Sequence, residues 1–150
     1  MIPDFKSMIS TATIWSELLK AKSISGFLRK NRENMLDLTL SEHLMLLLRK
    51  KKLKRADVVR DSGLEKAYVY QIFDGKKRPS RDKLIAIAFG LHLNSKETQR
   101  MLKLGGCSEL YARVARDAVI LFAIQRGMSI AAADDLLYKN NFPTLLDKDQ

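Results

Sequence analysis

The sequence predicts an all-α protein of 150 residues, and three observations favour this fold class. Hydrophobic residues make up 46% of the chain, which is enough to fill a core. Seven glycines and three prolines leave little room for the many tight turns that a β protein needs. Apolar residues recur at i, i+3 and i+4 behind residues that cap helices, which is the period of an amphipathic helix. The length suits one ordinary domain with helical extensions.

The first part of the chain, residues 1–38, is predicted to be an N-terminal helical extension. Two helices are expected, at 11–22 and 23–34, with Ser23 as the N-cap of the second. The second helix carries an apolar stripe of Ile24, Phe27 and Leu28. Trp15 is expected to anchor the first helix against an apolar surface.

Residues 39–106 are predicted to form a five-helix domain. The expected helices span 40–52, 55–62, 65–74, 81–91 and 95–104. Capping residues precede three of them, namely Thr39 with Glu42, Ser80, and Asn94 with Glu97. Glycines follow three of them, at Gly63, Gly75 and Gly105. The inward stripes include Leu40, Leu44, Leu47 and Leu48 in the first helix and Leu84, Ile87, Ala88 and Leu91 in the fourth.

The last part, residues 107–150, is predicted to hold two further helices, at 109–125 and 130–139, with Ser129 capping the second. The seven residues 118–124 are apolar on every side of the helix, so a single core-facing stripe does not account for them. We expect this segment to be covered by its own domain and by a partner subunit, which makes it the expected dimer surface. Two charged pairs are expected on solvated helix faces: Arg113 with Asp117, and Asp134 with Asp135.

The segment 63–80, GLEKAYVYQIFDGKKRPS, combines a turn glycine, a short helix, a glycine stop and a basic loop closed by proline and serine. Positive charge gathers around it, because residues 39–94 hold 13 Lys+Arg against 6 Asp+Glu, a net charge of +7 out of +10 for the chain. Residues 107–150 hold 5 against 6, a net charge of −1. Concentrated positive charge is typical of proteins that bind a polyanion. The segment therefore predicts an element that enters a DNA groove and contacts the phosphates beside it.

The order and spacing of these features resemble a known family. The five helices from Leu40 to Leu104, with the segment 63–80, look like the lambda-repressor-like, Xre-type helix-turn-helix domain. A looser likeness joins YQIFDGKKRPSRDKLI and LYARVARDAVI to bacterial Xre-type regulators with an extra helical C-terminal segment. Two positions depart from the family pattern, which usually has alanine where this chain has Val59 and glutamate where it has Phe73.

The resemblance implies that the helix at about 65–74 is a recognition helix that lies in the major groove of double-stranded DNA. It places Lys66, Ala67 and Gln71 at base-reading positions, with Tyr70 beside them against a thymine methyl or a phosphate. The side-chain chemistry agrees, because lysine donates to guanine O6 or N7 and glutamine pairs with adenine through two hydrogen bonds. The implied function is that of a sequence-specific transcriptional regulator.

Basic residues flank this helix on both sides. Arg55 begins the preceding helix, and Lys76, Lys77 and Arg78 form the loop that follows. These side chains suit phosphate contacts, which position a protein on DNA without reading its sequence. One recognition helix reads too few base pairs to select one genomic site, at about 1 to 3 kcal/mol per good contact. A homodimer on a palindromic operator is therefore expected.

Another class of function competes with this interpretation. A helical bundle is also compatible with a protein-interaction module that binds a regulatory protein partner, because a fold does not dictate a function. Taken alone, a basic loop such as 76–78 is an ordinary solvated surface, and Gln71 is an ordinary exposed helix residue. A prophage-type repressor and an antitoxin are both variants of the DNA-binding interpretation.

Other functions are disfavoured by the residue types. The sequence has no Gly-rich phosphate loop, GxSxG elbow or HExxH motif, so we expect no enzyme activity and no cofactor. His43 and His92 lack companions at ligand spacing, so no metal site is expected. Cys107 is the only cysteine, which rules out an intrachain disulfide and favours a reducing compartment. The sequence shows no leader and no membrane-length apolar run, so we expect a cytoplasmic protein that does not bind membranes.

Overall fold

The computed structural model describes residues 11–34 and 39–146, and these residues form helices without a strand, which confirms the predicted all-α class for them. The helices are α1 (Thr11–Lys20), α2 (Ile24–Lys30), the 3-10 turn η2 (Arg32–Asn34), α3 (Leu40–Lys51), α4 (Arg55–Ser62), α5 (Lys66–Phe73), α6 (Arg81–Gly90), α7 (Ser95–Leu104), α8 (Ala115–Gln125) and α9 (Ile130–Lys139). Residues 1–10 and 35–38 of the predicted N-terminal extension, and 147–150 of the predicted C-terminal segment, lie outside the described residues.

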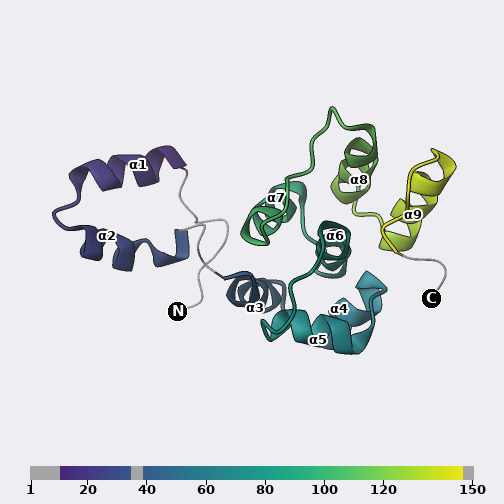
Figure 1. The fold of residues 1–150 in the computed structure, drawn as a ribbon, viewed down its shortest axis with the longest axis horizontal. Coiled ribbons are helices and arrows are strands. Elements are labelled where there is room, and N and C mark those ends of the chain that lie inside the picture. The colour runs from purple at the N-terminus through teal and green to yellow at the C-terminus, as the bar shows by residue number, and fades with distance from the viewer. Residues whose placement is uncertain (1–10, 35–38, 147–150) are drawn as a thin grey trace.

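Three parts follow one another across the molecule (Figure 1). The α1–α2 pair stands at one end, α3 to α7 gather around α6 in the middle, and α8 with α9 lies at the other end (Figure 1). Within the described ranges, no helix is both long enough and apolar enough to cross a bilayer.

The caps that the sequence predicts are formed. Thr39 accepts a hydrogen bond from the backbone N–H of Glu42 at 3.3 Å, and Ser129 accepts one from Ala132 at 3.2 Å. At the start of α7, Asn94 and Glu97 exchange both hydrogen bonds of a capping box. These bonds satisfy backbone donors that a helix end leaves without a partner, and so they fix where each helix begins.

α6 is the centre of the core. All residues from 84 to 90 are buried, so the helix is covered on every side and not along a single stripe. α4 and α7 pack against it, and α9 reaches it from the C-terminal part. The fully buried side chains from the surrounding helices include Leu44, Leu47, Ile72, Met101, Leu102, Ile120 and Leu137.

Gly90 determines how closely α4 approaches α6. A Cβ at this position would lie 2.9 Å from the carbonyl oxygen of Val58 and 3.0 Å from the Cβ of Ser62. Only glycine leaves room for the backbone of α4 at this distance. The contact holds α4, and therefore the start of the segment that follows it, at a fixed place on the core.

In the α1–α2 pair, one prediction from the sequence is confirmed and another is wrong. Ser23 caps α2 as predicted, because its hydroxyl accepts a hydrogen bond from the N–H of Gly26 at 3.1 Å. Phe27 is buried, with 8% of its surface exposed. Trp15, in contrast, is 62% exposed, so the expectation that it anchors α1 against an apolar surface is wrong.

Two ion pairs attach the C-terminal part to the start of α6. Arg81 donates to both carboxylate oxygens of Asp117, at 3.1 and 2.8 Å. Arg116 donates to both carboxylate oxygens of Asp82, each at 3.0 Å. The predicted surface pair between Arg113 and Asp117 is therefore wrong, because the carboxylate of Asp117 is buried and turned toward α6.

The helix predicted at 109–125 begins only at Ala115. Before it, Leu110 exchanges two backbone hydrogen bonds with the side chain of Gln99, at 2.6 and 2.7 Å. The carbonyl oxygens of the two residues before Leu110 accept hydrogen bonds from Arg81, each at 3.0 Å. These tertiary bonds occupy backbone groups that a helix would use internally, so they override the local helix propensity.

Asp134 is also placed differently from its prediction. Only its neighbour Asp135 lies on a solvated face, whereas Asp134 is 6% exposed. Its two carboxylate oxygens accept the backbone N–H groups of Leu145 at 2.7 Å and Leu146 at 3.1 Å. The carboxylate thus holds the end of the described chain against α9.

Candidate nucleic-acid interface

α4 and α5 meet at a turn built around Gly63. This glycine has the predicted left-handed conformation, with φ at 73°. The hydroxyl of Ser62 accepts a hydrogen bond from the N–H of Leu64 at 3.2 Å and closes the turn. A side chain at position 63 would be strained, and its Cβ would lie 2.7 Å from Cδ1 of Leu146. The turn therefore fixes the direction in which α5 leaves α4.

α5 has a buried face and an exposed face. The residues that attach it to the core are Val69, Ile72 and Phe73. The four residues predicted to contact bases are Lys66, Ala67, Tyr70 and Gln71, of which Tyr70 is half-buried and the others are exposed. Their spacing of i, i+1, i+4 and i+5 places them on one face of the helix. The structure therefore brings these four residues together on the outer face of α5.

Two of the predicted cations lie over the ring of Tyr70. The guanidinium carbon of Arg55 is 4.4 Å from the centre of the Tyr70 ring, and Nζ of Lys66 is 5.6 Å from it. Both distances are within the range of a cation–π interaction. Arg55 also forms an ion pair of 3.1 Å with Asp74, a residue that the sequence analysis did not single out. A phosphate that binds Arg55 has to compete with this carboxylate.

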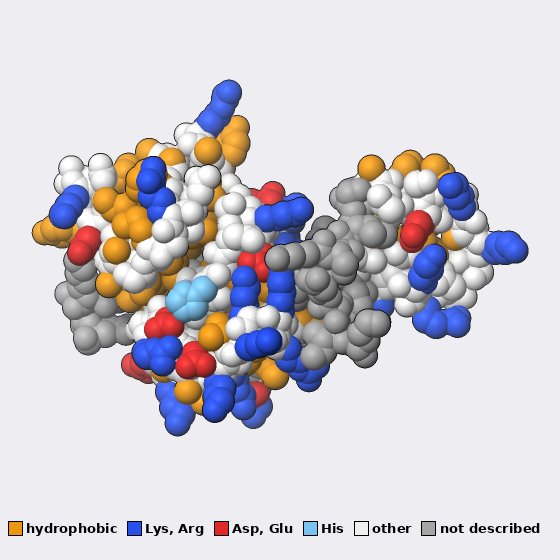
Figure 2. Space-filling view, turned by 180° about the vertical axis from the view of Figure 1, so that it is seen from behind, with side chains coloured by type: hydrophobic (Ala, Val, Ile, Leu, Met, Phe, Trp, Pro, Cys, Tyr) orange, Lys and Arg blue, Asp and Glu red, His pale blue; other side chains and the backbone are white. Residues whose placement is uncertain are grey.

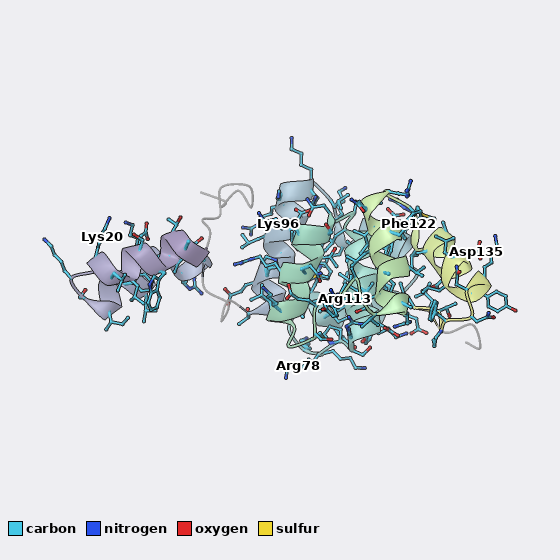
Figure 3. All side chains as sticks on the ribbon, turned by 90° about the horizontal axis from the view of Figure 1, so that it is seen from above. Lys20, Arg78, Lys96, Arg113, Phe122 and Asp135 are labelled. Carbon is cyan, nitrogen blue, oxygen red and sulfur yellow. The ribbon has the colours of Figure 1, made fainter. Side chains whose placement is uncertain are left out.

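The basic loop after α5 is exposed at all three of its cations, Lys76, Lys77 and Arg78. Nζ of Lys77 lies 5.6 Å from the centre of the Tyr68 ring. Nη2 of Arg78 lies 3.0 Å from the place that a Cβ of Gly106 would occupy, so the guanidinium rests on the turn that ends α7. Figure 3 shows Arg78 at the edge of the body. Lys77 and Arg78 thus have contacts that orient them, although all three side chains face solvent.

Both ends of this loop are fixed. Gly75 begins it in the left-handed conformation, with φ at 74°, and Pro79 is buried at its end. The hydroxyl of Ser80 accepts a hydrogen bond from the N–H of Lys83 at 3.4 Å and caps α6, as predicted. Burial of the Tyr68 ring raises the pKa of its hydroxyl, which a hydrogen bond with the backbone of Ser80 partly offsets. The ring beneath Lys77 is therefore part of the packed structure.

Two lysines at the end of α3 have another role. Lys50 and Lys51 each lie 2.9 Å from a carboxylate oxygen of Glu97. Burial by itself raises the pKa of Glu97, but hydrogen bonds from the backbone of Asn94 and from both lysines outweigh this effect, and the pKa is lowered. These two cations join α3 to α7, which reduces what they add to the surface charge around α5.

Positive charge still collects along one edge of the body. Figure 2 shows Lys and Arg side chains gathered on the lower edge, which is the edge formed by α4 and α5 in Figure 1. A cluster around Asp61 interrupts it, because the Asp61 carboxylate contacts Arg60 and His92 at 2.9 Å each. The hydrogen bond from Arg60, followed by that from His92, lowers the pKa of Asp61 to about 2. Asp61 therefore stays ionised and bound to these two residues at neutral pH.

The described residues contain no group of three or more His, Cys, Asp and Glu side chains arranged to hold a metal ion. His43 is buried inside the core, and His92 is part of the Asp61 cluster. The arrangement around α5 offers hydrogen-bond donors and positive charge on the exposed face of an eight-residue helix. Such a surface suits a polyanion that presents hydrogen-bond acceptors in a fixed order.

In the part of the chain that the structure describes, a helix, a left-handed glycine turn and a second helix form a unit on an all-helical core. No family model, curated protein or solved structure matches this chain.

Proposed function

We propose that this protein is a sequence-specific regulator of transcription that binds double-stranded DNA, with a lambda-repressor-like, Xre-type fold. It acts in the cytoplasm, as a homodimer on a palindromic operator. The observation that carries the proposal is the outer face of α5. There Lys66, Ala67 and Gln71 are exposed beside the half-buried Tyr70, while the opposite face of the helix is fixed in the core.

In this proposal α5 lies in the major groove, whose width of about 12 Å admits one helix. Lys66 donates to a guanine and Gln71 pairs with an adenine, the partners that their donor and acceptor groups fit. Tyr70 holds Arg55 and Lys66 over its ring, so one aromatic side chain positions a phosphate contact and a base contact. The loop with Lys77 binds the phosphates on the other side of the helix.

The test begins with selection of bound duplexes from random DNA, followed by measurement of affinity against salt concentration. Lys66→Ala and Gln71→Ala should each cost about 1 to 3 kcal/mol on the selected operator and relax its sequence preference at one position. Lys77→Ala should weaken all sequences alike and reduce the salt slope by about 0.9. Lys96→Ala removes an equally exposed lysine from α7 and should change neither quantity.

Two results would contradict the proposal in different ways. If all three variants bind the operator as the wild type does, α5 is not the element that reads DNA. If no duplex binds at moderate salt, the protein-interaction module becomes the better interpretation, and an acidic partner should then compete for the cations around α5.

A further inference from the structure

An acidic side chain lies at the C-terminal end of α5, beside the predicted DNA contacts. Asp74 directly follows the last residue of the helix, Phe73, and the basic loop begins two residues later, at Lys76. The Asp74 side chain is 46% exposed. A carboxylate repels phosphates, so in this position it opposes the binding of DNA that the neighbouring cations favour.

Asp74 is bound to one of the predicted phosphate contacts. Its Oδ1 atom accepts a hydrogen bond from Nη1 of Arg55 at 3.1 Å. The backbone holds the residue in place, because the N–H of Asp74 donates to the carbonyl oxygen of Tyr70 at 2.9 Å. Arg55 is the first residue of α4, so this ion pair joins the start of α4 to the end of α5.

A phosphate that reaches Arg55 meets the Asp74 carboxylate there. The side chain of Arg55 is 36% exposed, and its guanidinium carbon lies 4.4 Å from the centre of the Tyr70 ring, within the range of a cation–π interaction. Either the ion pair opens when the phosphate binds, or the two anions share one guanidinium and repel each other. In both cases the contact contributes less to DNA binding than that of an arginine without a carboxylate partner.

The basic loop differs in this respect. Lys77 is paired with the ring of Tyr68, and its Nζ atom lies 5.6 Å from the ring centre. A tyrosine ring carries no charge at neutral pH, so a phosphate that binds Lys77 displaces no carboxylate from this ring. We therefore expect Lys77 to contribute equally to the binding of any duplex, because a phosphate contact does not read sequence. The contribution of Arg55 depends on how firmly the rest of the protein holds the phosphate beside it.

The ion pair itself adds little to the stability of the fold. Both of its side chains are partly exposed, and solvent screens such a pair. The attachment of α5 to the core comes from its buried residues Val69, Ile72 and Phe73. The charge of Asp74 therefore matters more for what binds to the interface than for the stability of the interface.

On the basis of the proposed DNA-binding function, we propose that Asp74 is a specificity-determining residue: by pairing with Arg55, it keeps this cation from strengthening the binding of non-operator DNA. On such DNA the protein is held by phosphate contacts alone, and at Arg55 the phosphate competes with the carboxylate. On the operator, the base contacts of Lys66 and Gln71 fix α5 in the groove and hold the phosphate beside Arg55, so that it replaces the carboxylate. The ion pair therefore weakens non-operator binding more than operator binding.

Asp74→Asn tests this directly, because it keeps the size of the side chain and removes its charge. Affinity is measured against salt concentration for the selected operator and for a non-operator duplex of equal length. The variant should bind non-operator DNA more tightly, on the order of threefold, with a salt slope steeper by about 0.9, the value for one added phosphate contact. Operator affinity should change less, so the ratio of the two affinities should fall. Asp135→Asn is the matched control, because it makes the same change of charge on the exposed side of α9 and should keep the wild-type ratio.

A double-mutant cycle separates an effect that acts through Arg55 from a general effect of charge. In an Arg55→Ala background, Asp74→Asn should no longer steepen the salt slope for non-operator DNA. Glu65→Gln removes a carboxylate from the other end of α5, where it makes no side-chain capping bond, and its effect should be the same in both backgrounds. Asp74→Glu keeps the charge and should keep the wild-type ratio of affinities.

Arg55→Ala by itself covers the case in which Asp74→Asn fails to fold. It should weaken operator binding and flatten the operator salt slope by about 0.9 with the non-operator slope unchanged, whereas Lys77→Ala should flatten both slopes. The inference is overturned if folded Asp74→Asn keeps the wild-type ratio and slopes, if its effect persists in the Arg55→Ala background, or if Arg55→Ala flattens both slopes alike. If the wild type binds no duplex, the proposed function fails together with this inference, whereas the three preceding outcomes leave the proposed function standing.

Discussion

The two helix pairs that flank the α3–α7 core are attached in opposite ways. The α8–α9 pair is joined to α6 by Arg81 with Asp117 and by Arg116 with Asp82, with the side chain of Asp117 only 6% exposed. The α1–α2 pair meets α3 through an ion pair of 3.3 Å between Arg32 and Glu42, whose side chains are 70% and 45% exposed. Sequence patterns alone describe both pairs simply as helical extensions.

The difference in attachment indicates that the C-terminal pair is held firmly on the core and the N-terminal pair only weakly. Two bidentate ion pairs keep α8 in one orientation on α6. In one of them the carboxylate of Asp117 is buried, so the loss of either partner in that pair is costly. Arg81 directly follows Ser80, the cap that ends the basic loop, so the C-terminal pair also supports the candidate DNA interface. An exposed ion pair contributes only about 0 to 1 kcal/mol, so the contact of Arg32 with Glu42 holds the N-terminal pair weakly.

The largest effect is expected when the C-terminal attachment is broken. Asp117→Ala leaves Arg81, whose side chain is 25% exposed, without its carboxylate, and removes the acceptor for the N–H of Tyr111. Loss of one partner of a buried ion pair should lower the free energy of unfolding by about 3 to 5 kcal/mol, as measured by urea denaturation. Asp135→Ala, on the exposed side of α9, should leave it unchanged. Equal unfolding curves for the two variants would show that the C-terminal pair is no better attached than the N-terminal one.

A pH titration should distinguish the α3–α7 core, which contains His43, from the C-terminal attachment. Burial, and then the charge of Arg100, lowers the pKa of His43 from 6.5 to about 4, although Glu97 acts in the opposite direction. The unfolded chain therefore takes up this proton below pH 6.5 and the folded chain only near pH 4. Stability contributed by neutral His43 is complete above pH 6.5 and is lost toward pH 4, at about 1.4 kcal/mol per pH unit and about 3 kcal/mol in total.

The C-terminal attachment should persist through that window. Burial by itself raises the pKa of Asp117, but hydrogen bonds from Arg81 and from the N–H of Tyr111 outweigh this and lower it. Its contribution is therefore lost only as the pH falls below the ordinary aspartate value of about 3.9. Urea unfolding from pH 7 to 4.5 should show the His43 slope in the wild type and a flatter slope in His43→Gln. An unchanged slope in a folded His43→Gln variant would assign the titration to another group.

The sequence predicted helix boundaries best where the signal is local. Ser23, Thr39, Ser80, Asn94 and Ser129 all cap the helices assigned to them, because a capping bond joins residues three apart. It failed where distant groups decide the outcome. Residues 109–114 were predicted as the start of a helix, but Gln99 and Arg81, which lie on other helices, form hydrogen bonds with the backbone of this region.

In the candidate site, too, the sequence predicted the local features and missed the contacts between distant residues. The turn at Gly63 and the exposure of Lys66, Ala67 and Gln71 agree with a pattern that the sequence contains. The ion pair of Arg55 and Asp74 joins residues that are 19 apart in the sequence. The contact of Arg78 with the turn at Gly106 joins residues that are 28 apart. No periodicity within one helix encodes such contacts. Contacts with distant residues also explain why Asp134 is buried while the adjacent Asp135 is exposed, because Asp134 binds the backbone of Leu145 and Leu146.

An intermediate effect is expected at the far end of the C-terminal pair. Asp134→Ala removes the acceptor of two backbone N–H groups, at Leu145 and Leu146, in a region where Asp134 is 6% exposed. Buried donors that lose their partner cost about 1 to 3 kcal/mol in stability. Amide hydrogen exchange should accelerate at these two residues, while α5 keeps its protection. Protection that is unchanged at Leu145 and Leu146 would mean that another acceptor replaces the carboxylate.

The smallest effect is expected at the N-terminal attachment, and it is the result that most sharpens the contrast. Arg32→Ala removes an ion pair that solvent already screens, so the free energy of unfolding of the α3–α7 core should change by less than about 1 kcal/mol. The conformational freedom of the α1–α2 pair should increase instead, seen as faster amide exchange at Phe27 in dilute, monomeric protein. A loss of core stability as large as that of Asp117→Ala would show that the N-terminal pair is an integral part of the fold.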